Sequence, residues 1–204
     1  MAIIGVERPT ILDYSNSGNV VTYSNPTVMG KATNIDLTLN SGNENVLYGD
    51  NSPAERDNQF GGGSLGVGTT ELDASIAGNL LGITPTSATS VSGAKFINYD
   101  DDAVAPYKGF FAVRKHQVNG AIKYSGVYYD KIQFQNVQQS LETQGETINW
   151  QTPTIEAALF RSDAAKHGWG GETSLVDSVD DVVDLCYEHF GYTPPTPGPG
   201  GDVS

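Results

Sequence analysis

The chain has 204 residues, a net charge of −13 and one cysteine, Cys186. The acidic balance argues against a surface that grips nucleic acid or anionic membranes, because both are bound through Lys and Arg. A lone cysteine excludes an internal disulfide and fits cytosolic assembly, and the apolar runs are too short to span a membrane. We also expect no signal peptide, because Met1–Gly5 lacks a basic segment followed by an apolar one.

Strands and loops are predicted for the first sixty residues. Lys31–Leu39 alternates apolar Ile35, Leu37 and Leu39 with polar residues, which is typical of a half-buried strand. Asn40–Phe60 follows as a long polar stretch rich in Asn, Gly and Asp. A stretch of this length indicates a functional or mobile loop.

A short helix is predicted after the glycine-rich segment Gly61–Gly68. Thr70 is the expected N-cap and Gly82 the expected residue just past the C-terminus. Apolar residues at i, i+4 and i+8 form one stripe, which we expect to pack on a sheet. The packing residues of this helix are Leu72, Ile76, Leu80 and Leu81.

The clearest element is a β-hairpin in the second half of the chain. Lys108–Val118 and Ala121–Tyr129 flank the dipeptide Asn119-Gly120, and both of these residues tolerate positive φ. Thr84–Asp102, which precedes the hairpin, is predicted as a polar loop. Further strands are predicted over Lys131–Val137 and Thr147–Phe160.

A second helix is predicted over Leu175–Phe190, where apolar residues recur at helical spacing. Acidic residues near its C-terminal end oppose the macrodipole, so this helix needs packing to persist. Thr193–Ser204 is rich in Pro and Gly, which indicates a linker or a flexible end. We therefore divide the chain into a β-domain (1–162), a helical extension (163–192) and a tail (193–204). Regularly spaced strands and turn signals favour a sandwich or barrel.

Two segments match binding motifs only in part. Gly61–Gly66 satisfies G-x-G-x-x-G, but no apolar strand precedes it and Thr84–Ser92 holds no acid to meet a ribose, so we interpret it as a turn. Asp13–Gly18 begins like a calcium loop, yet its twelfth position is Ser24 rather than the bidentate Glu. We interpret the charge run Asp100–Asp102 as solvated.

Two further patterns resemble catalytic motifs. Cys186 and His189 lie three apart on a helix, but Cys186 belongs to the apolar stripe, which favours core packing over a nucleophile. Ser92–Lys95 matches S-x-x-K by letters alone, without the helix or the K-T-G partner that the motif needs. We expect no catalytic residue, no metal site and no cofactor, and hence no enzyme.

Several segments in order resemble the major tail protein family of long-tailed bacteriophages. An acidic segment of the form "D…AE.DN.F.GG" is matched by Tyr48–Asn51 with Ala54–Gly62, and the family's helix ending Leu-Leu-Gly by Leu80–Gly82. Pro106–Phe110 resembles the entry into the central hairpin, and Gly145–Glu156 resembles the "GE.I.fqTP.ieg" strand pair. The acidic C-terminal helix and the Pro/Gly tail depart from the family pattern.

The resemblance implies a mainly β (α+β) fold, with two packed antiparallel sheets in a sandwich or barrel-like arrangement, a flanking helix, a long inter-subunit loop and a C-terminal helix. It implies hexameric rings whose sheets join into a channel and which stack into a tail tube that conducts DNA without binding it specifically. The implied partners are other copies of the chain and tape-measure, terminator and tip proteins, with no membrane. The implied location is the virion tail, after assembly in the host cytoplasm.

The predicted subunit and ring interface lies in the long polar loop, where acidic, basic and amide residues can pair and aromatic residues can anchor. Its residues are Tyr48, Asp50, Asn51, Glu55, Arg56, Asp57 and Phe60. Two alternatives stay open: the tube of a tail-derived bacteriocin or contractile injection system, and a glycan-binding β-sandwich, suggested by the Tyr content and the Asn/Gly loops.

Overall fold

The computed structural model describes residues 2–41, 45–49, 52–57, 60–98, 102–138 and 152–194. The described chain is mainly β with two helices, which confirms the predicted mainly β (α+β), sandwich-like class. The strands are β1 (Ala2–Ser17), β2 (Val20–Val28), β3 (Ala32–Ser41), β4 (Asn45–Gly49), β5 (Ser52–Asp57), β6 (Phe60–Thr69), β7 (Thr86–Ser87), β8 (Lys95–Phe96), β9 (Tyr107–Val118), β10 (Ala121–Gln138), β11 (Thr154–Phe160) and β12 (Gly170–Glu172). The helices are α1 (Ala74–Leu81) and α2 (Val179–His189).

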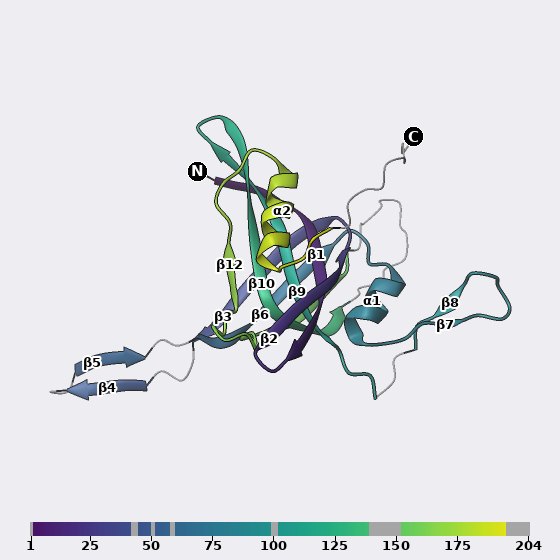
Figure 1. Ribbon diagram of the computed structural model, residues 1–204, viewed down its shortest axis with the longest axis horizontal. Coiled ribbons are helices and arrows are strands. Elements are labelled where there is room, and N and C mark those ends of the chain that lie inside the picture. The colour runs from purple at the N-terminus through teal and green to yellow at the C-terminus, as the bar shows by residue number, and fades with distance from the viewer. Residues whose placement is uncertain are drawn as a thin grey trace, which may run out of the picture.

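One antiparallel sheet of eight strands forms the body of the molecule, in the order β2-β1-β9-β10-β11-β6-β3, with β12 added beside β10. The sheet folds over on itself, so that β3 at one end of the path comes within 8 Å, Cα to Cα, of β1 near the other end (Figure 1). Two short hairpins, β4–β5 and β7–β8, form separate two-stranded sheets. The layers therefore belong to one continuous hydrogen-bonded sheet.

The fold of the sheet depends on a break between β2 and β3. β2 pairs with the second half of β1, whereas β3 pairs with β6. At the break, the Met29 amide donates to the Pro9 carbonyl (2.8 Å), and β1 itself is bulged at Arg8, whose φ is +52°. Strands that change partners at a bulge or bend are how a sheet turns a corner.

Two apolar clusters lie on opposite faces of the central strands. Phe110, Phe134 and Ile132 belong to the larger cluster, which fills the space inside the folded sheet and includes Leu80 of α1. The smaller cluster lies outside β9 and β10, where Phe111 and Val113 pack against Val182, Cys186 and Phe190 of α2 and its end. Both faces of the β9–β10 pair are thus covered, which explains its nearly continuous burial.

The first helix starts later than predicted. Its N-cap is Asp73, whose carboxylate accepts from the Ser75 amide (2.7 Å). Thr70, the predicted N-cap, directly follows β6 and donates its amide to the Lys31 carbonyl (2.9 Å). Gly82 closes it at φ +74°, as predicted. Leu80 is fully buried, Leu72 and Ile76 pack against the same cluster, and Leu81 is half-buried outside it.

The second helix begins at Val179 rather than Leu175, because the preceding residues form other contacts. Val176 pairs with Tyr124 of β10 through two backbone hydrogen bonds (2.8 and 2.9 Å). The Ser178 hydroxyl then caps the helix by accepting from the Asp181 amide. α2 shares a core with the sheet, so the segment 163–192 packs on the β-domain and does not stand apart from it.

The predicted hairpin is confirmed: Asn119 and Gly120 turn between β9 and β10 with φ of +50° and +84°. The strand predicted over Lys131–Val137 is the continuation of β10, and β11 occupies the described end of Thr147–Phe160.

Two loop predictions were wrong. Asn40–Phe60 contains the end of β3 and the hairpin β4–β5, and Thr84–Asp102 contains the hairpin β7–β8. The turn predicted for the glycine motif Gly61–Gly66 was also wrong, since these residues form the β6 strand between β11 and β3. At Gly63 a Cβ would lie 2.6 Å from the Thr38 carbonyl oxygen, so glycine here lets two strands approach closely.

We predict that Gly126→Val destabilises the protein by about 1–3 kcal/mol, because overpacking a filled core displaces its neighbours. A Cβ at Gly126 would lie 2.7 Å from Cys186 Sγ and 3.0 Å from Val182 Cγ1, so the substitution pushes α2 off the sheet. Thermal unfolding followed by circular dichroism measures the loss. Gly5→Val is the matched control, since a Cβ there meets its nearest neighbour at 3.9 Å. Equal melting temperatures for the two variants contradict close docking of α2.

Candidate subunit interface

Several stretches of strand in the main sheet have one edge without a strand partner among the described residues. They include β2, β3 and the first half of β1, Ala2–Glu7, which pairs with β9 on one side only. β2 is interrupted by a bulge at Asn25-Pro26, with Asn25 at φ +50°, and proline cannot donate a hydrogen bond. β3 has no proline and only one charged residue, Asp36. β3 and the first half of β1, which also lacks proline and has one charged residue, are therefore the edges most open to strand addition.

The hairpin β4–β5 extends away from the main sheet, beyond the ends of β3 and β6 (Figure 1). It carries four of the predicted interface residues, Tyr48, Glu55, Arg56 and Asp57, on its strands. Asp50 and Asn51 lie outside the described residues. The segment predicted to reach a neighbouring subunit is thus a projecting β-hairpin, which we call the arm.

Phe60, the last predicted interface residue, packs within its own chain at the base of the arm. Its ring stacks on Trp169 with centroids 4.9 Å apart and planes 6° from parallel. Arg161 donates from Nη2 to the Phe60 carbonyl (2.8 Å) and lies near the same ring. Phe60 therefore fixes where the arm leaves the body, and its ring is engaged in an intramolecular contact.

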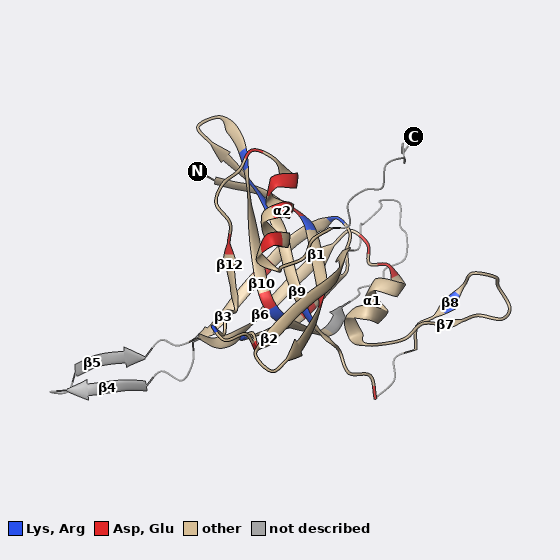
Figure 2. Ribbon diagram, viewed as in Figure 1, with Lys and Arg blue, Asp and Glu red and all other residues tan. Residues whose placement is uncertain are grey.

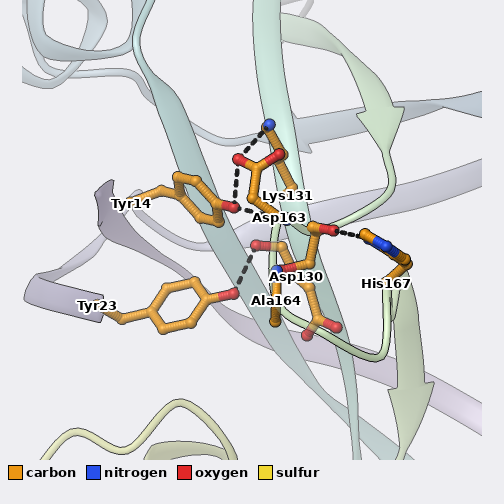
Figure 3. Close-up of polar contacts among 8 residues, drawn as sticks. Tyr14, Tyr23, Asp130, Lys131, Asp163, Ala164 and His167 are labelled. Atoms are coloured by element: carbon orange, nitrogen blue, oxygen red, sulfur yellow. Dashed lines mark hydrogen bonds and ion pairs between the residues drawn. The ribbon is translucent and has the colours of Figure 1, made fainter. Parts of the chain in front are cut away.

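A polar network holds the segment that contributes Trp169 (Figure 3). The Asp163 carboxylate accepts from the Tyr14 hydroxyl (2.8 Å) and from Lys131 Nζ (2.7 Å), so it joins β1 to β10. The Tyr14 oxygen in turn accepts from the Asp163 amide (3.0 Å). Lys131 is 9% exposed and lies 4.2 Å from the Tyr107 ring centroid, so its charge is doubly compensated.

A second part of this network comes from β2 and α2. The Tyr23 hydroxyl donates to the Asp130 carbonyl (2.9 Å), and Asp130 Oδ1 lies 2.7 Å from His189 Nε2 (Figure 3 draws the first contact). Burial and the nearby Asp130 charge raise the pKa of Tyr23. The polar groups of the network satisfy one another, which is typical of a structural clamp.

A cleft of about 630 Å³ opens where the first half of β1 diverges from β3. Its walls include Ile3, Ile4 and Val6 from β1 and Ile35 and Leu37 from β3. Ile3, Ile4 and Leu37 are 59%, 49% and 38% exposed, an unusual state for large apolar side chains beside a core. The sequence predicted a half-buried β3, but only Ile35 packs against the core cluster.

Charged residues at one end of this cleft form an ion pair. Arg114 contacts Glu172 of β12 through both terminal nitrogens (2.9 and 2.7 Å). Nearby on β9 and β10, the buried His116 shares a hydrogen bond with Ser125 (2.8 Å), and burial lowers the pKa of His116. Cleft charge is therefore balanced, and most of the lining is apolar.

Several basic side chains form ion pairs with carboxylates of the same chain, and acidic residues are exposed at the surface. Five described basic residues form ion pairs with carboxylates: Arg8 with Asp180, Lys108 with Asp13, Arg114 with Glu172, Lys123 with Asp177 and Lys131 with Asp163. Acidic residues gather on α2 and on the segment that enters α1 (Figure 2). The exposed charge is thus mainly negative, which disfavours binding to phosphate.

The other residues that resemble parts of catalytic or metal-binding motifs have structural roles in the fold. Burial raises the pKa of the Cys186 thiol to about 12, and Cys186 contacts the sheet, which supports the packing interpretation. Asp13 of the calcium-like segment is bound to Lys108 and Asn25. Among the described residues, no group of three His, Cys, Asp or Glu is placed to hold a metal, and no helix is long and apolar enough to cross a membrane.

In comparisons with known proteins, no family model matches the chain, and no curated protein sequence matches it.

We predict that Asp163→Asn flattens the acid side of the stability curve. Hydrogen bonds from Lys131 and Tyr14 lower the pKa of Asp163 below its ordinary value of 3.8, so the folded state binds this proton less tightly than the unfolded state. The contribution is complete above the unfolded-state pKa and is lost as the pH falls through the lower, folded-state pKa. Melting temperatures measured from pH 7 downward test this.

Asp102→Asn, which changes an exposed carboxylate outside the network, is the control and should keep the wild-type slope. Parallel curves for wild type and Asp163→Asn below pH 4 mean that the Lys131–Asp163 contact adds nothing to stability.

Proposed function

We propose that this protein is the subunit of a bacteriophage tail tube, which forms stacked hexameric rings and has no catalytic role. The observation that carries the proposal is a folded-over antiparallel sheet with open edges and a projecting arm in the chain segment that resembles the family's acidic motif. Open edges invite strand pairing between copies, and a closed ring satisfies them without uncontrolled growth.

Segments behind the resemblance occupy positions that suit it. Leu80–Gly82 ends α1 with a left-handed glycine, Pro106–Phe110 leads into β9 of the central hairpin, and Thr154–Glu156 opens β11. Gly145–Gln151, at the start of the last segment, lies outside the described residues. These placements support an architecture shared with the tail protein family, and we propose the assembly into a tube.

The distribution of charge supports a conduit for DNA. Exposed carboxylates repel phosphate over about 8–10 Å at physiological salt, so a tube wall of this composition lets DNA pass without adhering. Tape-measure, terminator and tip proteins are the further partners that this role requires. The tube of a bacteriocin or injection system shares every one of these features, and a neighbouring tape-measure gene together with capsid genes distinguishes a phage.

Electron microscopy of the concentrated protein tests the proposal. We expect rings or tubes, and Leu39→Lys on β3 should abolish them without lowering the melting temperature, because a 47% exposed site tolerates a charge that a sheet-to-sheet contact does not. Val91→Lys, at a 59% exposed apolar residue outside the main sheet, is the control and should assemble normally. A strict monomer at high concentration contradicts the tube function.

A further inference from the structure

The cleft between β1 and β3 presents unpaired backbone on both of its walls. In the described chain, Ala2–Glu7 hydrogen-bonds only to β9 on one side, and β3 hydrogen-bonds only to β6. Such edges carry rows of free N–H and C=O groups, which an added strand satisfies. Apolar side chains line the space between them, so a strand that enters gains side-chain burial as well as backbone hydrogen bonds.

Charge restricts what can enter. Among the described residues that line the cleft, only Arg114 and Glu172 are charged, and they neutralise each other. The chain as a whole carries −13, so a second copy is repelled over most of the surface but not at this cleft. An uncharged extended segment therefore suits the site, whereas a charged one would lose hydration without finding a partner.

The arm supplies such a segment. β4 has the sequence Asn-Val-Leu-Tyr-Gly, without a charge, whereas β5 holds Glu55, Arg56, Asp57 and also Pro53. β4 pairs with β5 on one side, and its other edge has no strand partner among the described residues. A strand of five residues is about 17 Å long, which fits along the ten-residue β3.

The arm also needs a partner for its own stability. A lone two-stranded hairpin is marginally stable in water, and a third strand with an apolar face is the usual remedy. Docking of β4 beside β3 would give the hairpin a third strand, namely β3, and an apolar face, namely the lining of the cleft. The open edge and the unsupported hairpin thus complement each other.

We propose that β4 of one copy adds as a strand to the β3 edge of a second copy, inside the β1–β3 cleft. This inference rests on the proposed function for its premise that copies assemble, and it names the receiving site of the arm. The contact joins two different surfaces, so its head-to-tail repetition links successive copies into a ring or a filament.

Disulfide trapping between two full-length variants tests the proposal. One variant is Leu37→Cys in the cleft, and the other, isotopically labelled, is Val46→Cys or Leu47→Cys on β4. The native Cys186 is fully buried and stays out of the reaction. Adjacent strand residues point to opposite faces, so only one of the two β4 variants should cross-link efficiently with Leu37→Cys.

We expect a mixed-mass dimer at least about tenfold above that formed by Val104→Cys, a 77% exposed control outside the cleft. A tenfold excess corresponds to about 1.4 kcal/mol of preference for the cleft. Ile3→Cys on the opposite wall is a second probe, in case Leu37→Cys lowers the melting temperature. Yields at the control level for both cleft variants, equal yields from Val46→Cys and Leu47→Cys, or cross-links within single chains overturn the proposal.

Electron microscopy of the same samples separates this inference from the tube function. Tubes without the mixed cross-link mean that the arm docks elsewhere, while the tube function stands. Mixed cross-links in a sample that stops at small oligomers support strand addition and contradict the tube function.

Discussion

The hydrogen bond from the Met29 amide to the Pro9 carbonyl marks the point on which the architecture depends. On one side of it, β2 continues the sheet beyond β1, and on the other side β3 leaves β1 and joins β6. Arg8 adopts a left-handed backbone conformation just before Pro9, a state that costs a non-glycine residue about 1–2 kcal/mol. The fully buried Met29 side chain and the sheet on both sides of the break hold that conformation in place.

Both the core and the cleft follow from this single divergence. Because the sheet turns here, its inner face closes over Phe110, Ile132 and Phe134 and forms a packed core. Because β1 and β3 separate beyond the junction, the same turn leaves an apolar cleft between two unpaired edges. The packed interior and the open cleft thus both result from the divergence of β1 and β3. α2 covers the outer face of β9 and β10.

Sequence patterns predicted local elements well and long-range contacts poorly. The turn at Asn119-Gly120 and the end of α1 at Gly82 follow from backbone preferences of the residues themselves, so they could be predicted. The clamp joins Tyr14 to Lys131 and Asp163, both more than a hundred positions away along the chain, and no periodicity in the sequence indicates this contact. The strand β6 was missed because glycine usually marks turns, whereas here Gly63 allows two backbones to approach.

The interface residues show the same division. The polar composition of Asn40–Phe60 predicted a segment that contacts a neighbouring subunit, but it did not predict the β4–β5 hairpin. The pairing of these strands depends on backbone hydrogen bonds rather than on an apolar pattern. The residue type of Phe60 predicts an anchor between subunits. In the structure, the clamp places Trp169 nearby, and the Phe60 ring stacks on Trp169 of the same chain. An aromatic residue beside a loop thus does not indicate an exposed anchor unless its own chain lacks a partner for it.

Negative charge and open edges have opposite effects on association, and together they make it selective. A strand edge with a single charged residue, such as that of β3, pairs readily with other strands, which is a hazard for a protein at high concentration. Copies that each carry −13 repel one another on approach, and at physiological salt this repulsion acts over about 8 Å. Only an approach that sets a neutral strand against the neutral cleft avoids the repulsion, so the acidic surface restricts the open edge to a few geometries. Specific assembly then requires no strong attraction at any one contact, because the repulsion between negatively charged copies disfavours the competing contacts.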